Sequence, residues 1–182
     1  GPMLHRAVQQ FLSDVFWGDL DVLLLDLPPG TGDVTISVAQ LLPNAEILVV
    51  TTPQAAAAEV AERTGLIAAQ THQKVLGVIE NMSYLLQDDG SRLEIFGSGG
   101  GQAVSDSLTQ VLGYQVPLMA QLPLDIRLRE GSDLGVPVTV SDHGRPPADS
   151  PAALELARVA SSIGHRARGL ARRPLGVSPV NT

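Results

Sequence analysis

The chain of 182 residues contains no cysteine and a single lysine, Lys74, and only 3% of its residues are aromatic. Without cysteine, the chain acting alone can form neither a disulfide nor a thiolate-held metal site. Apolar residues nevertheless make up 44% of the sequence. The predicted core is therefore built from Leu, Val, Ile and Ala, a mix that suits a parallel sheet covered by helices on both faces.

Membrane and nucleic-acid signals are also absent. No apolar run approaches the roughly 18 residues that a membrane span needs. The first residues, GPMLHRAVQQ, lack the basic region and apolar block of a secretory signal. The net charge of −7 argues against a broad nucleic-acid surface. We therefore expect a cytoplasmic protein that binds neither membranes nor nucleic acids.

The last stretch, residues 165–182, is rich in arginine and contains two prolines. Its composition favours a disordered tail, and the alternative is a contact for an anionic partner. We expect residues 1–164 to form one domain.

Hydrophobic periodicity predicts alternating strands and helices. Buried strands are expected over 20–26, 45–52, 74–82 and the first part of 116–125. Helices are expected over 3–15, 33–42, 53–71, 100–113 and 150–169, the last with Leu154, Ala157 and Ile163 facing inward. Residues 83–97 read as a hairpin that turns at Asp89-Gly90, and 126–142 as irregular chain with one helical turn. This order predicts an α/β fold with a parallel sheet flanked by helices.

Polar residues follow each predicted strand. Since parallel strands end at the same edge of a sheet, where ligands of such folds bind, these residues predict a ligand site. They are Asp26, Thr51, Thr52, Gln54, Asn81, Ser83 and Asp125.

The stretch DLPPGTGD, residues 26–33, is the most informative of these strand ends. A carboxylate at the tip of a buried strand needs a partner, and a hydrated Mg²⁺ is a suitable one. The following prolines fix φ while the glycines allow close backbone approach, so the loop could switch in response to a γ-phosphate. The alternative is a tight strand-to-helix turn in which Asp33 caps the helix.

Several segments closely resemble the Mrp/ApbC-type ATP-binding proteins, which are iron–sulfur cluster carriers related to the MinD and ParA ATPases. The matching segments, in the same order, are GPMLHRAVQQFL, DVLLLDLPPGTGDVTISVAQ, VVTTPQ, GVIENMS, IFGSGGG and PLMAQLPLD. The resemblance covers residues 1 to about 164. It implies a P-loop NTPase fold of the deviant Walker A class and an ATP-hydrolysing homodimer that delivers a 4Fe–4S cluster to apoprotein clients.

The resemblance also implies roles for single residues. Asp26 would be the catalytic, metal-side acid, holding Mg²⁺ through water. The switch loop would comprise Pro29, Gly30, Thr31, Gly32 and Asp33. Asn81 would hydrogen-bond the adenine, with Pro123 and Asp125 beside the base.

Two features depart from the family pattern. The phosphate-binding loop, glycine-rich and ending in Lys-Ser/Thr, is missing. In the family it lies before the point where this sequence starts, so we expect a C-terminal part that lacks the P-loop strand and binds ATP weakly by itself. The second departure is the Cys-x-x-Cys pair of many members, which is replaced by YLLQDDGSRLE. Direct cluster binding is doubtful because Gln87, Asp88 and Asp89 offer hard oxygen atoms where iron prefers sulfur.

Two other interpretations stay open at this point. One is a ParA/MinD-like positioning ATPase that works on a surface, and the other is a remnant of the fold without catalysis. The glycine-rich FGSGGGQ, residues 96–102, lacks the lysine of a phosphate loop and is interpreted as a flexible entry into a helix.

Overall fold

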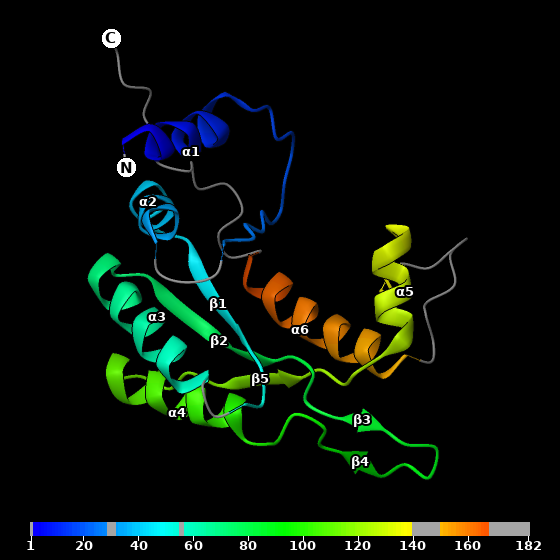
Figure 1. The fold of residues 1–182 in the computed structure, drawn as a ribbon. Helices are drawn as coiled ribbons and strands as arrows, with labels where there is room; N and C mark the ends of the chain where they lie inside the picture. The colour runs from blue at the N-terminus through cyan, green and yellow to red at the C-terminus, as the bar shows by residue number, and fades with distance from the viewer. Residues whose placement is uncertain (1, 29–31, 55–56, 140–149, 168–182) are drawn as a thin grey trace.

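The computed structural model describes residues 2–28, 32–54, 57–139 and 150–167 (Figure 1). Its elements, in chain order, are α1 (Pro2–Asp14), α2 (Asp33–Leu41), β1 (Glu46–Thr51), α3 (Ala57–Thr71), β2 (Lys74–Glu80), β3 (Leu85–Leu86), β4 (Arg92–Leu93), α4 (Gly100–Leu112), β5 (Leu118–Gln121), α5 (Ile126–Leu134) and α6 (Pro151–Ala167). No helix within these ranges is long and apolar enough to cross a membrane.

A parallel sheet in the order β1-β2-β5 forms the centre of the molecule. Six of the seven residues of β2 are buried, because this strand has a neighbour on each side and helices above and below. The arrowheads of the three strands point the same way in Figure 1, toward the β3–β4 hairpin and α5. The predicted α/β class with a parallel, helix-flanked sheet is confirmed.

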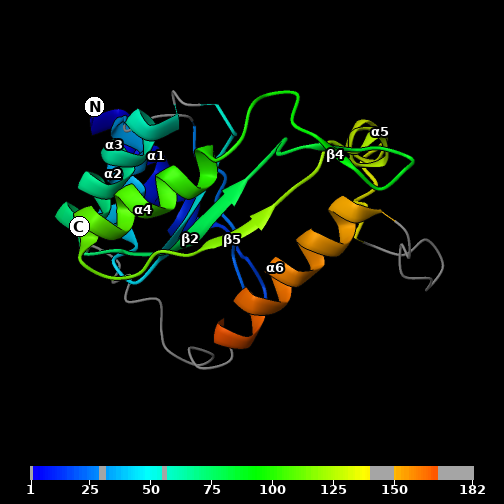
Figure 2. The ribbon, with the colours of Figure 1, turned by 90° about the horizontal axis from the view of Figure 1, so that it is seen from below.

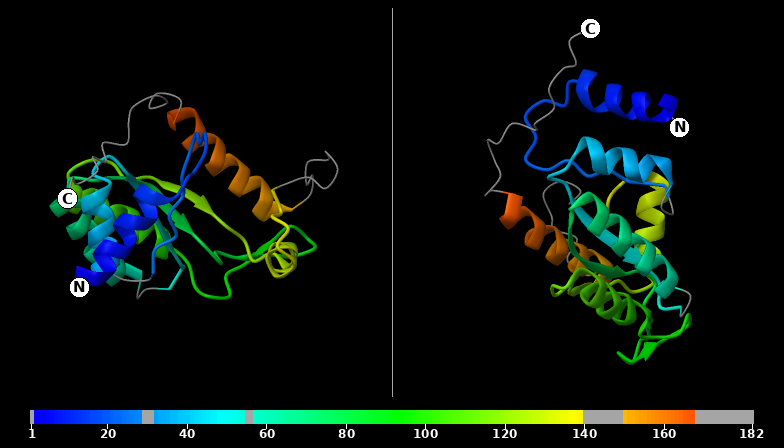
Figure 3. Two further views of the ribbon diagram at one scale, coloured as in Figure 1. Left: turned by 90° about the horizontal axis from the view of Figure 1, so that it is seen from above. Right: turned by 90° about the vertical axis from the view of Figure 1, so that its left-hand side faces the viewer.

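Helices cover both faces of the sheet, and each face has its own aliphatic core (Figure 2). On one face, α3 and α4 pack against β2 through residues such as Ala68, Val104 and Leu108. On the other face, α6 places Val159 against Ile79, Ala120 and Leu122. Figure 3 shows α1, α2, α3 and α4 side by side in a row. Aliphatic side chains account for both cores, as the composition predicted.

The expected buried strand over 20–26 is wrong for this structure. Residues 20–28 form no strand, and Val22, Leu23 and Leu24 are exposed, with Leu24 at 79%. A strand is stabilised by hydrogen bonds to a neighbour and by covered faces, and no described strand pairs with this segment.

The hairpin over 83–97 is confirmed, with β3 and β4 antiparallel. Its turn is at the predicted place, since Gly90 has a φ of 81° and its N–H donates to the Gln87 carbonyl at 2.9 Å. The region after β5 contains more helix than expected, because α5 runs for nine residues. In α6 the inward orientation of Leu154 and Ala157 is wrong, because both residues are exposed, Leu154 at 59%, whereas Ile163 does pack on the core.

Candidate functional site

The carboxyl ends of β1, β2 and β5 meet in one hydrogen-bonded rim. The Asn81 N–H donates to the Thr51 carbonyl at 2.8 Å, which joins the ends of β1 and β2. Beyond β5, the Leu122 N–H donates to the Glu80 carbonyl at 2.7 Å and the Ser83 N–H to the Leu122 carbonyl at 2.9 Å. The segment after β2 thus runs beside the segment after β5, so the strand ends share one edge as expected for parallel strands.

Asn81 lies in a strained turn. Met82, the next residue, has a φ of 57°, in the left-handed region that costs a non-glycine residue roughly 1 kcal/mol or more. The Asn81 Oδ1 atom accepts from the Met82 N–H at 2.9 Å. Ser83 closes the turn, because its hydroxyl donates to the Glu80 carbonyl at 2.9 Å. Asn81 is half-buried, and among the described residues its Nδ2 group donates no hydrogen bond.

Pro123 is buried and Asp125 caps helix α5. The Asp125 Oδ1 atom accepts from the Arg127 N–H at 2.8 Å, and its other oxygen accepts from the Ser150 hydroxyl. Partial burial alone would raise the pKa of Asp125, but the hydrogen bonds from Ser150, Arg127, Ala152 and Leu128 outweigh burial and lower it. Asp125 is thereby fixed as a carboxylate beside the rim.

Asp26 and the loop after it contribute less to this geometry. Asp26 is exposed, and no hydrogen bond or ion pair within the described ranges joins it to the rim. Pro29, Gly30 and Thr31 lie outside the described residues. Gly32 is the N-cap of α2 in extended conformation and Asp33 the first helical residue, so the expectation that Asp33 itself caps the helix is off by one residue.

The donor set of the β3–β4 hairpin does not fit an iron–sulfur cluster. The chain has no cysteine, and Asp89 Oδ1 is already engaged in the turn, accepting from the Ser91 N–H at 2.8 Å and from its hydroxyl at 2.6 Å. These hydrogen bonds hold the pKa of Asp89 below its usual value. Within the described part of the chain, no three His, Cys, Asp or Glu side chains are grouped to hold a metal ion.

The single carboxylate of Asp26 could bind a hydrated Mg²⁺ ion through one of its water molecules, but it could not hold the ion by itself. The described residues offer no phosphate cradle.

Sequence reasoning missed three residues at the rim: Glu80, Gly100 and Gly101. Glu80 is 1% exposed although it can carry a charge, and it stands at the end of a strand in the quoted segment GVIENMS. Gly100 and Gly101 belong to the glycine-rich run that was interpreted as a flexible entry. They are instead tightly packed, because a Cβ atom on Gly100 would lie 2.5 Å from the Pro53 carbonyl oxygen. A charged residue directly after the apolar run VLGVI of residues 75–79 was the available signal.

Comparison with known families identifies the fold more closely. The sequence model of the family described as "ParA: NUBPL iron-transfer P-loop NTPase" matches residues 1–163. The chain belongs to this family. The resemblance to Mrp/ApbC-type ATP-binding proteins is thereby confirmed, as is the P-loop NTPase fold.

Relatives of the family agree with this assignment. The chain is 60% identical over 179 residues to a Mycobacterium leprae protein named iron-sulfur cluster carrier protein, and 45% identical over 143 residues to a Synechocystis protein of the same name. The match covers 98% of this chain but 45% of the Mycobacterium protein, and 78% of this chain but 39% of the Synechocystis protein. The chain thus spans less than half the length of these curated relatives.

A solved structure shares the fold. It is described as the nucleotide-binding protein in complex with ADP from Archaeoglobus fulgidus. The two structures superpose with a TM-score of 0.61 at 36% identity, and the match covers 73% of this chain and 53% of the other.

Proposed function

We propose that this chain forms the base-binding part of an ATP-dependent iron–sulfur cluster carrier. The observation that supports the proposal is the hydrogen-bonded rim: the Asn81 N–H donates to the Thr51 carbonyl, and the Ser83 N–H, two residues on, donates to the carbonyl of Leu122, the residue before Pro123. Two relatives that are 60% and 45% identical are named cluster carriers, and the fold neighbour was solved with ADP.

In this proposal the Asn81 amide hydrogen-bonds the adenine, with Pro123 against the base and Asp125 beside it. Asp26 is the metal-side acid, and the loop from Pro29 to Asp33 responds to the γ-phosphate. Mg²⁺, when bound with ATP, neutralises charge on the phosphates. The working protein is a homodimeric ATPase that acts in the cytoplasm on apoprotein clients. Residues 1–164 act as one domain, and residues 165–182 form a separate basic tail.

The cluster is cargo in this scheme, and its ligands come from outside these 182 residues. Thiolates match iron because both are soft, whereas the hairpin offers amide and carboxylate oxygen atoms. Anaerobic reconstitution of the chain should therefore yield no stoichiometric iron and sulfide. Stoichiometric cluster on this chain would contradict that statement.

The function is tested with a chimera in which residues 1–164 replace the matching part of the Mycobacterium leprae relative. The chimera should hydrolyse ATP in the presence of Mg²⁺ and transfer a reconstituted cluster to an apoprotein. The isolated chain should show no micromolar ATP affinity. A chimera without ATPase activity, beside an active parent, would overturn the proposal, and binding to DNA or liposomes would favour a positioning ATPase.

The role of Asp26 is tested in the same chimera. Asp26→Asn should lower kcat roughly 10–100-fold, the range seen when the partners that orient bound metal are removed. Asp21→Asn is the matched control, because Asp21 is exposed and lies five residues earlier. Equal activity of the two variants would remove Asp26 from the proposed machinery.

A further inference from the structure

Glu80 is a buried carboxyl group that connects three elements at the rim. It is the last residue of β2 and is 1% exposed. Its Oε2 atom accepts from the Gly101 N–H at the start of α4, at 2.5 Å, and its Oε1 atom accepts from the Gln121 side chain at the end of β5, at 2.9 Å. Burying a carboxyl group is costly unless it has such partners. The hydrogen bonds from Gly101 and Gln121 therefore offset the cost of burying Glu80 at this place.

The glycines at the start of α4 make this contact possible. A Cβ atom on Gly101 would lie 2.7 Å from the Glu80 Cβ and 2.9 Å from its Oε2. On Gly100 it would lie 2.6 Å from the Thr52 carbonyl oxygen. The start of α4 therefore packs closely against the residues after β1 and against the end of β2, and only glycine fits at both positions.

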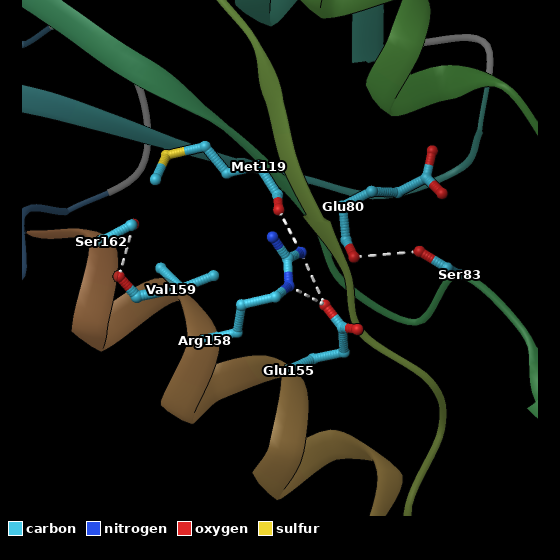
Figure 4. A network of polar contacts seen from close by, with 7 residues as sticks. All are labelled: Glu80, Ser83, Met119, Glu155, Arg158, Val159 and Ser162. Atoms are coloured by element: carbon cyan, nitrogen blue, oxygen red, sulfur yellow. Dashed lines mark hydrogen bonds and ion pairs between the residues drawn. The ribbon is translucent and has the colours of Figure 1, made fainter.

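The same residue borders the Asn81 turn on its other side. The Glu80 carbonyl accepts from both the Leu122 N–H and the Ser83 hydroxyl. Figure 4 shows this contact with Ser83, and it shows the Glu80 carboxyl group pointing away from the Arg158–Glu155 ion pair on α6. The strained backbone at Met82 therefore lies between two fixed points, Glu80 and Ser83.

These contacts also fix both ends of the β3–β4 hairpin. The chain enters the hairpin just after Ser83 and returns from it through the run Gly97–Gly101. Both ends are held by Glu80, one through its carbonyl and the other through its carboxyl group. Glu80 thus joins the return of the hairpin to the Asn81 turn, in addition to the direct chain connection through Ser83.

We propose that Glu80 is a positioning residue that holds the Asn81 turn in its strained, base-binding geometry and couples that turn to the hairpin. The claim that this geometry serves base binding rests on the proposed ATP site. The claim that Glu80 holds the turn does not. Glu80 touches no reacting atom in this scheme, and its effect is exerted through Gly101, Gln121 and the Asn81 turn.

The conformational part is tested on the 182-residue chain by amide NMR and hydrogen exchange. Glu80→Gln keeps the size of the side chain but replaces one acceptor oxygen by an NH₂ donor. We expect faster exchange, roughly tenfold, at the amides of Gly101, Asn81 and Ser83. The control is Glu155→Gln, the same substitution on the far face of the sheet, which should leave these amides unchanged. Gln121→Ala, which removes one partner from the edge, should give a smaller effect in the same amides.

The functional part is tested in the active chimera by separating KM from kcat. Glu80→Gln should raise the KM for ATP roughly tenfold while kcat stays within about threefold, and Glu155→Gln should change neither. A fall in kcat with an unchanged KM would contradict the proposal that Glu80 positions the Asn81 turn.

If Glu80→Gln changed exchange only at the Gly101 amide and left Asn81 and Ser83 unaffected, the positioning role of Glu80 would also be contradicted, since its role would then be purely structural. If the unmodified chimera lacks ATPase activity, the ATP site fails as a proposal and the exchange data alone decide whether Glu80 holds the turn.

Discussion

Two stretches of this chain have nearly the same apolar character but different environments. Residues 22–25 read VLLL and residues 75–79 read VLGVI. The second stretch lies in β2, where Val75 is 1% and Val78 0% exposed, whereas Leu24 in the first is 79% exposed. The difference is one of neighbours, because β2 pairs with β1 and β5 while the first stretch pairs with no described strand. Hydrophobicity makes a segment suitable for burial, but partners determine whether it is buried.

The largest expected effect comes from matched leucines in the two environments. Leu108→Ala removes a side chain that is 0% exposed in the core formed by α4 and β2, and should lower the free energy of unfolding by about 3 kcal/mol through lost burial and a cavity. Leu24→Ala should stay within about 0.5 kcal/mol. Urea denaturation followed by circular dichroism measures both. Equal losses would show that residues 20–28 are as well packed as the sheet.

The second effect concerns two helical glycines. Gly101→Ala forces a Cβ atom against Glu80 and should destabilise the chain by about 2 kcal/mol. Gly164→Ala, in α6, meets nothing within 4 Å and should stabilise by about 0.5–1 kcal/mol, because alanine is the better helix former. Thermal melts of the two variants should therefore shift in opposite directions. A neutral Gly101→Ala would contradict the tight junction at the start of α4.

The smallest effect depends on pH. Because the pKa of Asp125 is lowered in the folded chain, its stabilisation is complete above the ordinary value of 3.8 and is lost as the pH falls through the lowered pKa. Asp125→Ala should cost about 1 kcal/mol at neutral pH, as for other helix caps, and the difference from the parent should narrow below pH 3.8. Asp133→Ala, at the other end of α5, is the control, with a change below about 0.5 kcal/mol. If the difference in unfolding free energy between the parent and Asp125→Ala did not change with pH, the charged carboxylate of Asp125 could not be its cause.

The sequence was most informative where local pattern and tertiary environment agree. The paired strands, the helices on them and the Asp89-Gly90 turn follow from periodicity and turn chemistry, and the ends of β1, β2 and β5 meet at one edge as expected for parallel strands. The strand over 20–26 failed because periodicity reports suitability for burial and says nothing about partners. Glu80 was missed because its two acceptor contacts join residues 21 and 41 positions away, which no local pattern encodes. The assignment of Asp26 and Pro29–Asp33 to phosphate chemistry stays a prediction.

The single tryptophan of the chain is well placed to follow the less packed region. Trp17 lies between α1 and the unpaired stretch, with its ring edge-on to Phe11 at 5.1 Å between centroids. Its emission therefore reports on the first part of the chain, while far-ultraviolet circular dichroism follows the helices of the whole described chain, with α3 and α6 the longest at 15 and 17 residues. Recording both signals in one titration would resolve loosening of the amino-terminal segment from collapse of the sheet, without any added label.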